Sequence, residues 1–206
     1  SLSTHKAIPS PPGTDPSQRK VNQEADPVMM FNGQFVHEAT DITINGAGIA
    51  FTFTRTYKNQ IPFNGPLGFN WTHNFHIWLR VANETIFRAT GDLREEAFTK
   101  HPNFEVKVPE DKGRDFDYWI PPDGKDGVIF ANGNSFDLRH PDGMLYSFGQ
   151  DPSHSFLHRL NEIKDRHGNY LALDYSPSDN LLRAIYVNHA QRVVTFIYDD
   201  QRRIST

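Results

Sequence analysis

Histidines are the residues whose type and spacing come nearest to a metal site. The sequence has 206 residues, ten of them histidine and none cysteine, so a zinc site would need imidazole and carboxylate ligands. His73 and His76 are three residues apart, and His154 and His158 are four apart. A spacing of three places side chains on opposite faces of a strand, and the second pair begins in a turn predicted at Asp151–Phe156. We therefore expect no metal-binding residue and no cofactor.

Two carboxylate pairs could in principle perform acid–base chemistry. Asp115 and Asp117 would share one face of a strand, and Asp199 is followed directly by Asp200. Solvated charges at turns and sheet edges explain both pairs more simply, because nothing in the sequence builds a pocket around them. The sequence also has no Gly-x-Ser-x-Gly elbow and no glycine loop that would cradle phosphate. We therefore predict no catalytic residue and no enzymatic activity.

Aromatic side chains offer a different chemistry, the stacking of sugar rings. Trp71, Trp78 and Trp119, with seven tyrosines, could line such a platform. Half-buried sheets also favour aromatic residues, which fill the buried face and form cross-strand pairs. We favour the filled sheet and keep a surface carbohydrate-binding or adhesion module as the alternative.

The composition limits the partners that such a chain would bind. Its net charge is −4, its isoelectric point is about 6.2 and no basic patch stands out, so we expect neither nucleic acid nor an anionic membrane as a partner. Aromatic residues make up 13% of a chain whose mean hydropathy is −0.61, as half-exposed sheets would require. No apolar run of about 18 residues predicts a membrane span, and the N-terminus lacks the apolar core of a signal peptide.

Alternating apolar and polar residues predict short strands along most of the chain. In residues 51–57, one face should bury aromatic surface and the other should show threonine hydroxyls. Residues 74–80 repeat the alternation. Asn45-Gly46 lies between two such runs and predicts a hairpin, which Ala47-Gly48 would lengthen or bulge. Two strand–turn units in residues 128–148 predict an antiparallel meander.

An internal repeat occupies the C-terminal part. Residues 165–175 align with residues 188–198, so that Tyr175 and Tyr198 occupy equivalent positions. Each unit reads strand, turn, strand, and one hairpin cannot bury its apolar face alone. Stacked units should therefore form a continuous sheet.

Several segments, taken in order, resemble a known family. They are Asp26–Val28, Asn32–Phe35, Thr40–Gln60 and Gly65–Phe75, and they follow one another over about a quarter of the chain. This series resembles the N-terminal shell segment of bacterial Rhs (YD-repeat) proteins. The resemblance implies a hollow shell of β-hairpins, called a β-cocoon, that encloses a C-terminal toxic domain.

The last repeat is similar to the YD-repeat core, which reads Tyr-Asp, two variable residues, then Gly-Arg-Leu-Thr. Tyr198–Ser205 matches this core except at Arg202, where the family has glycine. We expect Asp179 and Arg202 to take the left-handed turn position in the two repeats. Arginine is less favourable there than glycine by roughly 1 kcal/mol.

The resulting expectation is an all-β protein of antiparallel hairpins in a curved sheet. We divide it into a disordered Pro-rich arm (1–25), an Rhs-like β segment (26–150) and open-ended YD-like hairpin repeats (151–206). No capping unit follows the last repeat, so we expect this sequence to be a piece of a longer protein, or its last strand to be covered by another element.

The resemblance also implies function, partners and location. The segment would be a non-catalytic part of a toxin shell, and any toxic enzyme would lie downstream of it. Its partners would be the downstream shell and toxin domain, and a secretion-system spike or chaperone could contact residues 1–25. The protein would be bacterial, made in the cytoplasm and delivered to target cells by a secretion system.

Overall fold

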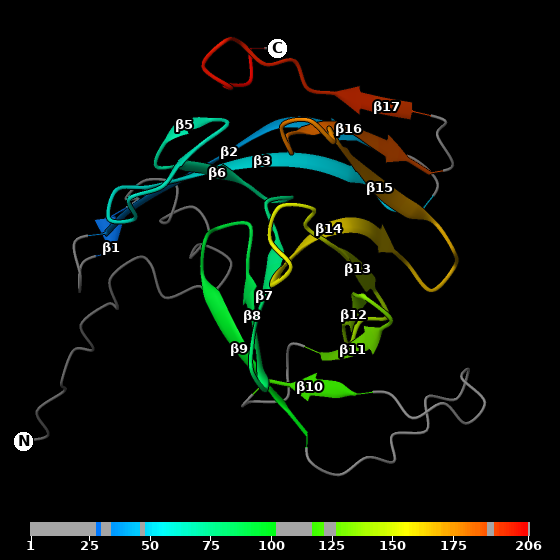
Figure 1. Ribbon diagram of the computed structural model, residues 1–206. Helices are drawn as coiled ribbons and strands as arrows, with labels where there is room; N and C mark the ends of the chain where they lie inside the picture. Colours follow the sequence, from blue (N-terminus) through cyan, green and yellow to red (C-terminus); the bar gives the residue numbers. More distant parts are fainter. Residues whose placement is uncertain are drawn as a thin grey trace, which may run out of the picture.

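The computed structural model describes residues 28–29, 34–45, 48–101, 117–121, 127–188 and 192–205. Throughout these ranges the regular elements are β-strands, and each pairing between strands is antiparallel (Figure 1), which confirms the predicted fold class. The expected arm at residues 1–25 lies outside the described residues. The described residues contain no helix long and apolar enough to cross a membrane.

Eight consecutive strands close into a ring around a common axis (Figure 1). The ring consists of β7 (Trp78–Ala82), β8 (Thr85–Ala89), β9 (Glu95–Lys100), β10 (Tyr118–Ile120), β11 (Val128–Asn132), β12 (Ser135–Arg139), β13 (Leu145–Gln150) and β14 (Leu157–Lys164). Each strand pairs with the next along the chain, and β14 pairs with β7 to complete the circle. The predicted meander of residues 128–148 forms β11, β12 and β13.

Local turn chemistry explains why these strands fold into adjacent hairpins. Two residues connect β7 to β8, and the first of them, Asn83, has φ = 54°. Two residues also connect β11 to β12, and there Gly133 has φ = 60°. Left-handed residues match the twist of two-residue hairpins, and asparagine and glycine adopt that conformation at little cost.

The buried face of the ring carries a continuous row of large apolar side chains. Ile86 lies directly opposite Phe98, and Ile129 lies opposite both Trp119 and Leu138 in the strand register. Phe148 continues the row opposite Leu160 on β14. Relative exposure does not exceed 6% for any residue of this row. Period-two alternation sends these residues to one face, and closure of the ring removes that face from water.

β14 also starts a second stack of strands. Its C-terminal half pairs with β15 (Tyr170–Tyr175), which is followed by β16 (Leu182–Val187) and β17 (Arg192–Thr195). The ring and this stack form one eleven-stranded sheet. The repeat units identified in the sequence are therefore neighbouring hairpins, as predicted.

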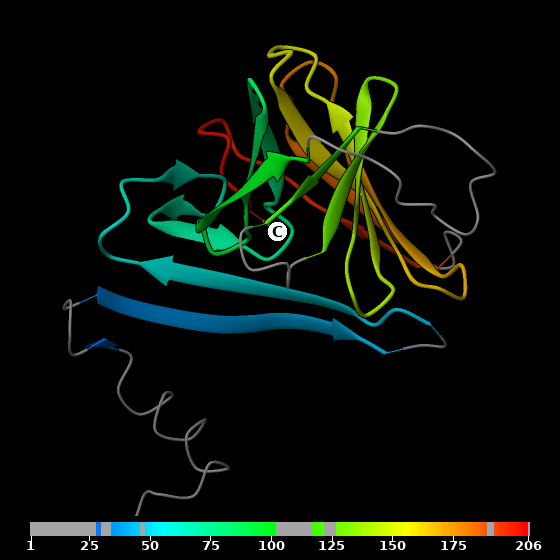
Figure 2. The ribbon, with the colours of Figure 1, turned by 90° about the horizontal axis from the view of Figure 1, so that it is seen from below.

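A separate four-stranded sheet lies against this assembly, and Figure 2 shows β2 and β3 as a layer along one side of the molecule. Its order is β1 (Val28–Met29), β2 (Gln34–Ile44), β3 (Phe51–Lys58) and β6 (Trp71–His73); β4 (Asn64–Gly65) and β5 (Gly68–Phe69) form a small hairpin beside it. β2 and β3 pair antiparallel up to Ile44 and Phe51, as the hairpin predicted at Asn45-Gly46 requires, and Gly46 and Ala47 of its turn lie outside the described residues. Its connection runs from residue 45 to 50, and a separate bulge lies in β2 between Thr40 and Ile42.

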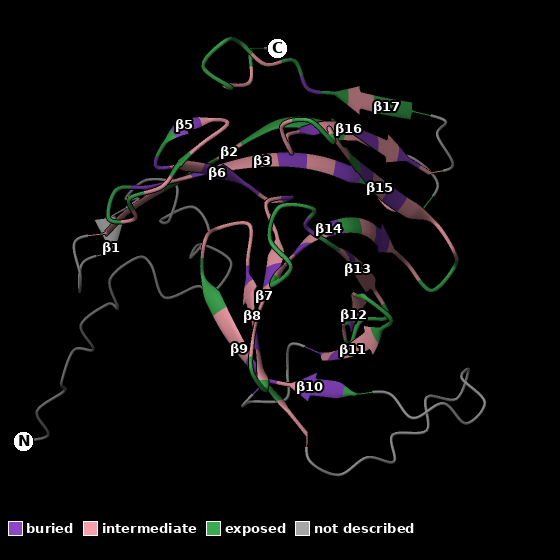
Figure 3. Ribbon diagram, in the orientation of Figure 1, coloured by how far each residue is buried: buried purple, intermediate pink, exposed green. Residues whose placement is uncertain are grey.

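The predicted burial of β3 holds for only half of the strand (Figure 3). Phe51 and Phe53 are buried as expected. Further along the strand the other face is buried, and Thr56 and Lys58 are only 5% and 7% exposed. The prediction was wrong there, and for Lys58 the reason is a partner in the β8–β9 turn of the ring. Lys58 Nζ donates to the carbonyl oxygen of Asp92 in that turn at 2.6 Å.

Further polar contacts join the four-stranded sheet to the rest of the molecule. The Asn74 side chain donates to the Thr52 carbonyl at 2.8 Å and accepts from the Thr54 N–H at 3.0 Å. Arg192 donates to the Asn45 carbonyl at 2.7 Å. A Cβ on Gly91 would lie 2.6 Å from the Asn74 Cα, so only glycine permits this approach. We call this set of contacts, with Lys58 and Asp92, the inter-sheet joint.

Candidate functional site

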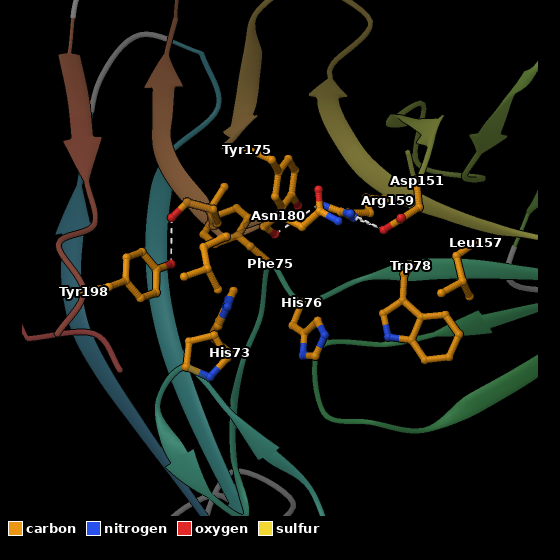
Figure 4. Close-up of a pocket in the computed structure, with 13 residues that line it drawn as sticks. His73, Phe75, His76, Trp78, Asp151, Leu157, Arg159, Tyr175, Asn180 and Tyr198 are labelled. Carbon is orange, nitrogen blue, oxygen red and sulfur yellow. Dashed lines mark hydrogen bonds and ion pairs between the residues drawn. The ribbon is translucent and has the colours of Figure 1, made fainter. Parts of the chain in front are cut away.

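A cavity of about 270 Å³ lies between the four-stranded sheet and the strands β14 to β16 (Figure 4). Its walls come from the end of β6 and the β6–β7 connection, from β14, from the end of β15 and the turn before β16, and from the segment that follows β17. The lining residues are Pro66, His73, Phe75, His76, Trp78, Asp151, Leu157, Arg159, Tyr175, Asn180, Leu181, Leu182 and Tyr198. Most of these side chains are apolar or aromatic, and a few polar groups converge on the same space, as in small-molecule sites.

Both histidines of the first predicted pair line this cavity. β6 ends at His73, and His76 belongs to the connection that precedes β7. Period-two alternation therefore does not apply between them, and the expectation of opposite faces was wrong. Their ring centroids lie 5.8 Å apart. Thr72 Oγ1 and His76 Nδ1 are within hydrogen-bond distance at 3.3 Å, and the His73 ring stacks on Phe53 with centroids 5.1 Å apart.

Burial keeps both imidazoles neutral. Burial, with a smaller contribution from the neighbouring His76, lowers the pKa of His73 to about 3. Burial also lowers the pKa of His76 to about 4. An imidazolium in this apolar space would lose its hydration without gaining a carboxylate partner, so the neutral form is favoured.

An ion pair stands at the mouth of the cavity. Arg159 Nε donates to Asp151 Oδ2 at 2.6 Å, and Arg159 Nη1 donates to the Asn180 carbonyl at 3.1 Å. Burial acts to raise the pKa of Asp151, but hydrogen bonds from Arg159 and from the Ser153 N–H outweigh it and lower that pKa. The mouth opens into a shallow, more polar depression that includes Asp179 and Arg202.

The two repeat tyrosines form the wall near β15 and β16. The Tyr175 hydroxyl donates to the Leu160 carbonyl at 3.0 Å, and the Tyr198 hydroxyl donates to the Leu182 carbonyl at 2.7 Å. An arginine lies over each ring: the Arg159 guanidinium is 5.2 Å from the Tyr175 centroid, and that of Arg183 is 4.9 Å from the Tyr198 centroid. Equivalent positions of the sequence repeat thus make equivalent contacts.

The left-handed turn residue is the expected one in the last repeat and a different one in the repeat before it. Arg202 adopts the left-handed conformation with φ = 61°, as predicted. In the other repeat the left-handed residue is Asn180, with φ = 63°, and not Asp179. Asp179 instead uses its carboxylate to accept from the Leu181 N–H at 3.1 Å and to pair with Arg183.

The second histidine pair does not converge. His154 is exposed in the turn before β14, and its Nδ1 lies 3.7 Å from Asp151 Oδ1. His158 is buried on β14, where Nε2 is 3.2 Å from the Asn134 carbonyl and the ring packs against Phe136. Among the described residues, no three His, Asp or Glu side chains are placed to hold a metal ion.

The predicted carboxylate pairs take structural positions where they are described. Asp115 lies outside the described residues, and Asp117 forms an ion pair with Lys100 at 2.9 Å. Asp199 Oδ1 accepts from the N–H groups of Gln201 and Arg203 at 2.9 and 2.8 Å, which stabilises the last turn.

The three tryptophans lie in three different environments. Trp119 is buried in the ring, and Trp78 lines the cavity. Trp71 faces a shallow depression outside the cavity, where its ring lies 5.4 Å from that of Tyr57 and 6.1 Å from that of His37. The described residues therefore provide no platform shared by all three tryptophans.

Sequence reasoning missed Asp151, Arg159 and Lys58. Arg159 stacks on the repeat tyrosine Tyr175, as Arg183 stacks on Tyr198. The two arginines occupy different positions in their repeat units, so the repeat pattern does not identify Arg159. Lys58 falls at the end of an alternating run where exposure is the ordinary expectation. No local pattern in the sequence distinguishes these residues from other surface charges.

Comparisons with known proteins place this architecture among described folds. Residues 25–98 match a protein-family model described as a domain of unknown function, DUF6531. No curated protein matches the chain.

Two similar solved structures contain toxin components. One is the Tc holotoxin pore of Photorhabdus luminescens with a mutated TccC3, which is 17% identical with a TM-score of 0.50; the match covers 75% of this chain and 9% of that one. The other is the TcdB2–TccC3 crystal structure, which is 16% identical with a TM-score of 0.52; the match covers 76% of this chain and 10% of that one. This chain thus spans about a tenth of the length of the chains it matches, and the likeness establishes a shared fold.

Proposed function

We propose that this chain is a non-catalytic wall segment of an Rhs-type toxin shell. In this role it would help to enclose a C-terminal toxic domain until a secretion system delivers the assembly to target cells. The single observation that carries the proposal is the fold likeness to the TcdB2–TccC3 structure, with a TM-score of 0.52 over 76% of this chain. The residues that resemble the Rhs shell, from Asp26 to Phe75, support the same assignment.

The pairing of strands suits a containing wall. The closed ring leaves its eight strands paired on both sides over part of their length, and β14 carries the sheet on into β15, β16 and β17. Backbone pairing of this kind satisfies donors and acceptors without side-chain chemistry. On the outermost described strand, Val193 is 46% exposed, and Ile197 beyond it is 58% exposed. An apolar edge of this kind favours the addition of another strand.

The partners follow from the same proposal. The shell segment would contact the downstream shell and toxin domain, in one chain or after cleavage. Residues 1–25 would connect it to a secretion-system spike or a chaperone. The protein would be made in the bacterial cytoplasm and leave it as part of the delivered assembly.

One observation favours a second candidate, a carbohydrate-binding module. Phe35, His37, Tyr57, Asn59 and Trp71 line a shallow depression on the four-stranded sheet. Aromatic rings beside an amide and an imidazole could stack on a sugar and bond its hydroxyls. Trp71→Ala should abolish glycan binding, whereas Trp119→Phe, a change outside the depression, should not. This pair of results would support the candidate.

The shell proposal is tested by protection of a cargo. A polypeptide that contains this chain and the proposed C-terminal toxic domain is digested with trypsin. The rate at which the toxic domain is cleaved is compared with the rate for the same domain expressed alone. Enclosure should slow this cleavage at least about 10-fold, because a protease cuts only the open state. Equal cleavage rates would contradict the proposal.

A ring variant supplies the matched control. Leu138→Asp places a charge in the buried row of the ring, at a position that is 1% exposed, and should restore cleavage of the cargo. Phe69→Asp, at a position that is 61% exposed, should leave protection unchanged. Light scattering on both variants separates a locally opened wall from general aggregation.

A further inference from the structure

The cavity described above has the size of a substituted aromatic ring. Its volume is about 270 Å³. An apolar protein cavity of about 150 Å³ already accepts benzene. A ring with one or two substituents therefore fits this space, and a large cofactor does not.

The walls favour an aromatic occupant over an aliphatic one. Phe75, Trp78, Tyr175 and Tyr198 present rings to the cavity (Figure 4). Aromatic pairs in edge-to-face or offset contact are more stable than simple burial alone would make them. Both tyrosine hydroxyls already donate to backbone carbonyls, so these two rings are held in place.

The charged groups at the mouth favour a neutral occupant. Arg159 is bound to Asp151 and to a backbone carbonyl, so its charge is already compensated. Both histidines inside the cavity are neutral at ordinary pH. An ionised ligand would lose its hydration on entry and gain no opposite charge in return.

A buried, unpartnered nitrogen supplies the polar feature of the site. His73 lines the cavity and is 7% exposed, and its Nδ1 has no hydrogen-bond partner. A buried imidazole nitrogen without a partner destabilises the folded chain, and a ligand that donates to it would remove this penalty. Rotation of the ring about the Cβ–Cγ bond exchanges Nδ1 with Cδ2, so a ligand donor could recruit this nitrogen.

We propose that this cavity is a binding site for a neutral aromatic ring with one hydrogen-bond donor, a phenol or an indole, with His73 as the acceptor. The ring could belong to a free small molecule or to a tyrosine or tryptophan side chain of another polypeptide. The site bridges the four-stranded sheet and the β14–β16 hairpins, so its occupant would hold the two together. This inference is independent of the shell proposal, because it depends only on the cavity.

Calorimetric titration of the full chain with three probes tests the site. p-Cresol should bind with a Kd between about 0.1 and 3 mM, within the range that a ligand of this size reaches. Toluene, which lacks the hydroxyl, should bind about 5- to 10-fold more weakly, as the loss of one hydrogen bond predicts. N-acetyltyrosinamide should bind at least as well as p-cresol if the source is a polypeptide side chain, and much more weakly if the source is a free molecule.

Two variants locate the binding. Leu157→Phe adds volume to the cavity wall and should abolish binding of p-cresol, whereas Leu145→Phe, the same change on a half-buried residue outside the cavity, should not. His73→Phe should keep the binding of toluene but remove the preference for p-cresol. The proposal is overturned if no probe binds, or if Leu157→Phe binds p-cresol as the unmodified chain does. Equal affinity for p-cresol and toluene would refute the role of His73.

Discussion

The eight-stranded ring and the inter-sheet joint hold this molecule together in different ways. In the ring, neighbouring strands exchange backbone hydrogen bonds, and a row of apolar side chains fills the enclosed face. In the joint, single side chains reach between segments far apart in the sequence, such as Lys58 with Asp92 and Arg192 with Asn45. The ring therefore depends on burial, and the joint depends on specific polar contacts. The two should therefore respond differently to mutation and to pH.

The largest effect is expected from a cavity in the ring. Phe148→Ala removes a side chain that is 1% exposed and should lower the free energy of unfolding by about 3–5 kcal/mol. Urea unfolding followed by circular dichroism measures this change. Phe69→Ala, at a position 61% exposed, should change it by less than about 0.5 kcal/mol. Similar losses in the two variants would mean that the ring row is not the core.

Acid should destabilise the folded chain through His73, which directly precedes the joint residue Asn74. The pKa of His73 is about 3 in the folded chain and about 6.5 when unfolded, so between these values the unfolded state binds the extra proton. The free energy of unfolding is therefore highest above pH 6.5 and falls as the pH is lowered. Proton binding by His73 in the unfolded state should reduce it by about 2–3 kcal/mol at pH 4.5. Unfolding at pH 7.5 and pH 4.5 measures the loss.

A variant without the imidazole separates this effect from general acid denaturation. His73→Phe should lose less stability than the unmodified chain between pH 7.5 and 4.5, because it has no proton to bind at this position. Equal losses in both proteins would show that other groups cause the acid sensitivity.

Breaking the ion pair of the joint should have an intermediate effect. Burial acts to raise the pKa of Asp92, but hydrogen bonds from Thr90 and Lys58 and nearby positive charges lower it. Asp92→Asn leaves the Lys58 ammonium, whose side chain is 9% exposed, without its carboxylate and should cost about 1–3 kcal/mol.

A double-mutant cycle with Lys58→Met isolates this pair. Lys58→Met removes the buried charge as well as its partner contact, so Asp92→Asn should cost less in that background. An equal cost in both backgrounds would assign the effect to the bonds that Asp92 makes with Thr90 and Arg94.

The smallest effects are expected at the repeat tyrosines. Tyr175→Phe and Tyr198→Phe each remove one hydroxyl that donates to a backbone carbonyl, and each should cost about 0.5–1.5 kcal/mol. Thermal unfolding of the two variants should give shifts of the same sign and similar size. A shift in only one of them would show that the two repeat units are not energetically equivalent.

Much of the fold could be predicted from the sequence because its elements are local. Period-two alternation predicted the strands, and the Asn45-Gly46 hairpin, the meander of residues 128–148 and the stacked repeat hairpins all formed as expected. Adjacent strands joined by short turns have few alternatives, since turn residues such as Asn83 and Gly133 fix the direction of the chain.

Tertiary structure alone decided the ring closure, the cavity and the joint. The pairing of β7 with β14 joins segments about 80 residues apart, and the alternation of apolar and polar residues does not predict it. The same is true of His73 and His76, which strand alternation assigned to opposite faces but which share one cavity because β6 ends between them. Lys58 is buried because a turn more than 30 residues away supplies its partner. Side-chain alternation reports which way a residue points on its own strand, whereas burial depends on what the rest of the chain places over it.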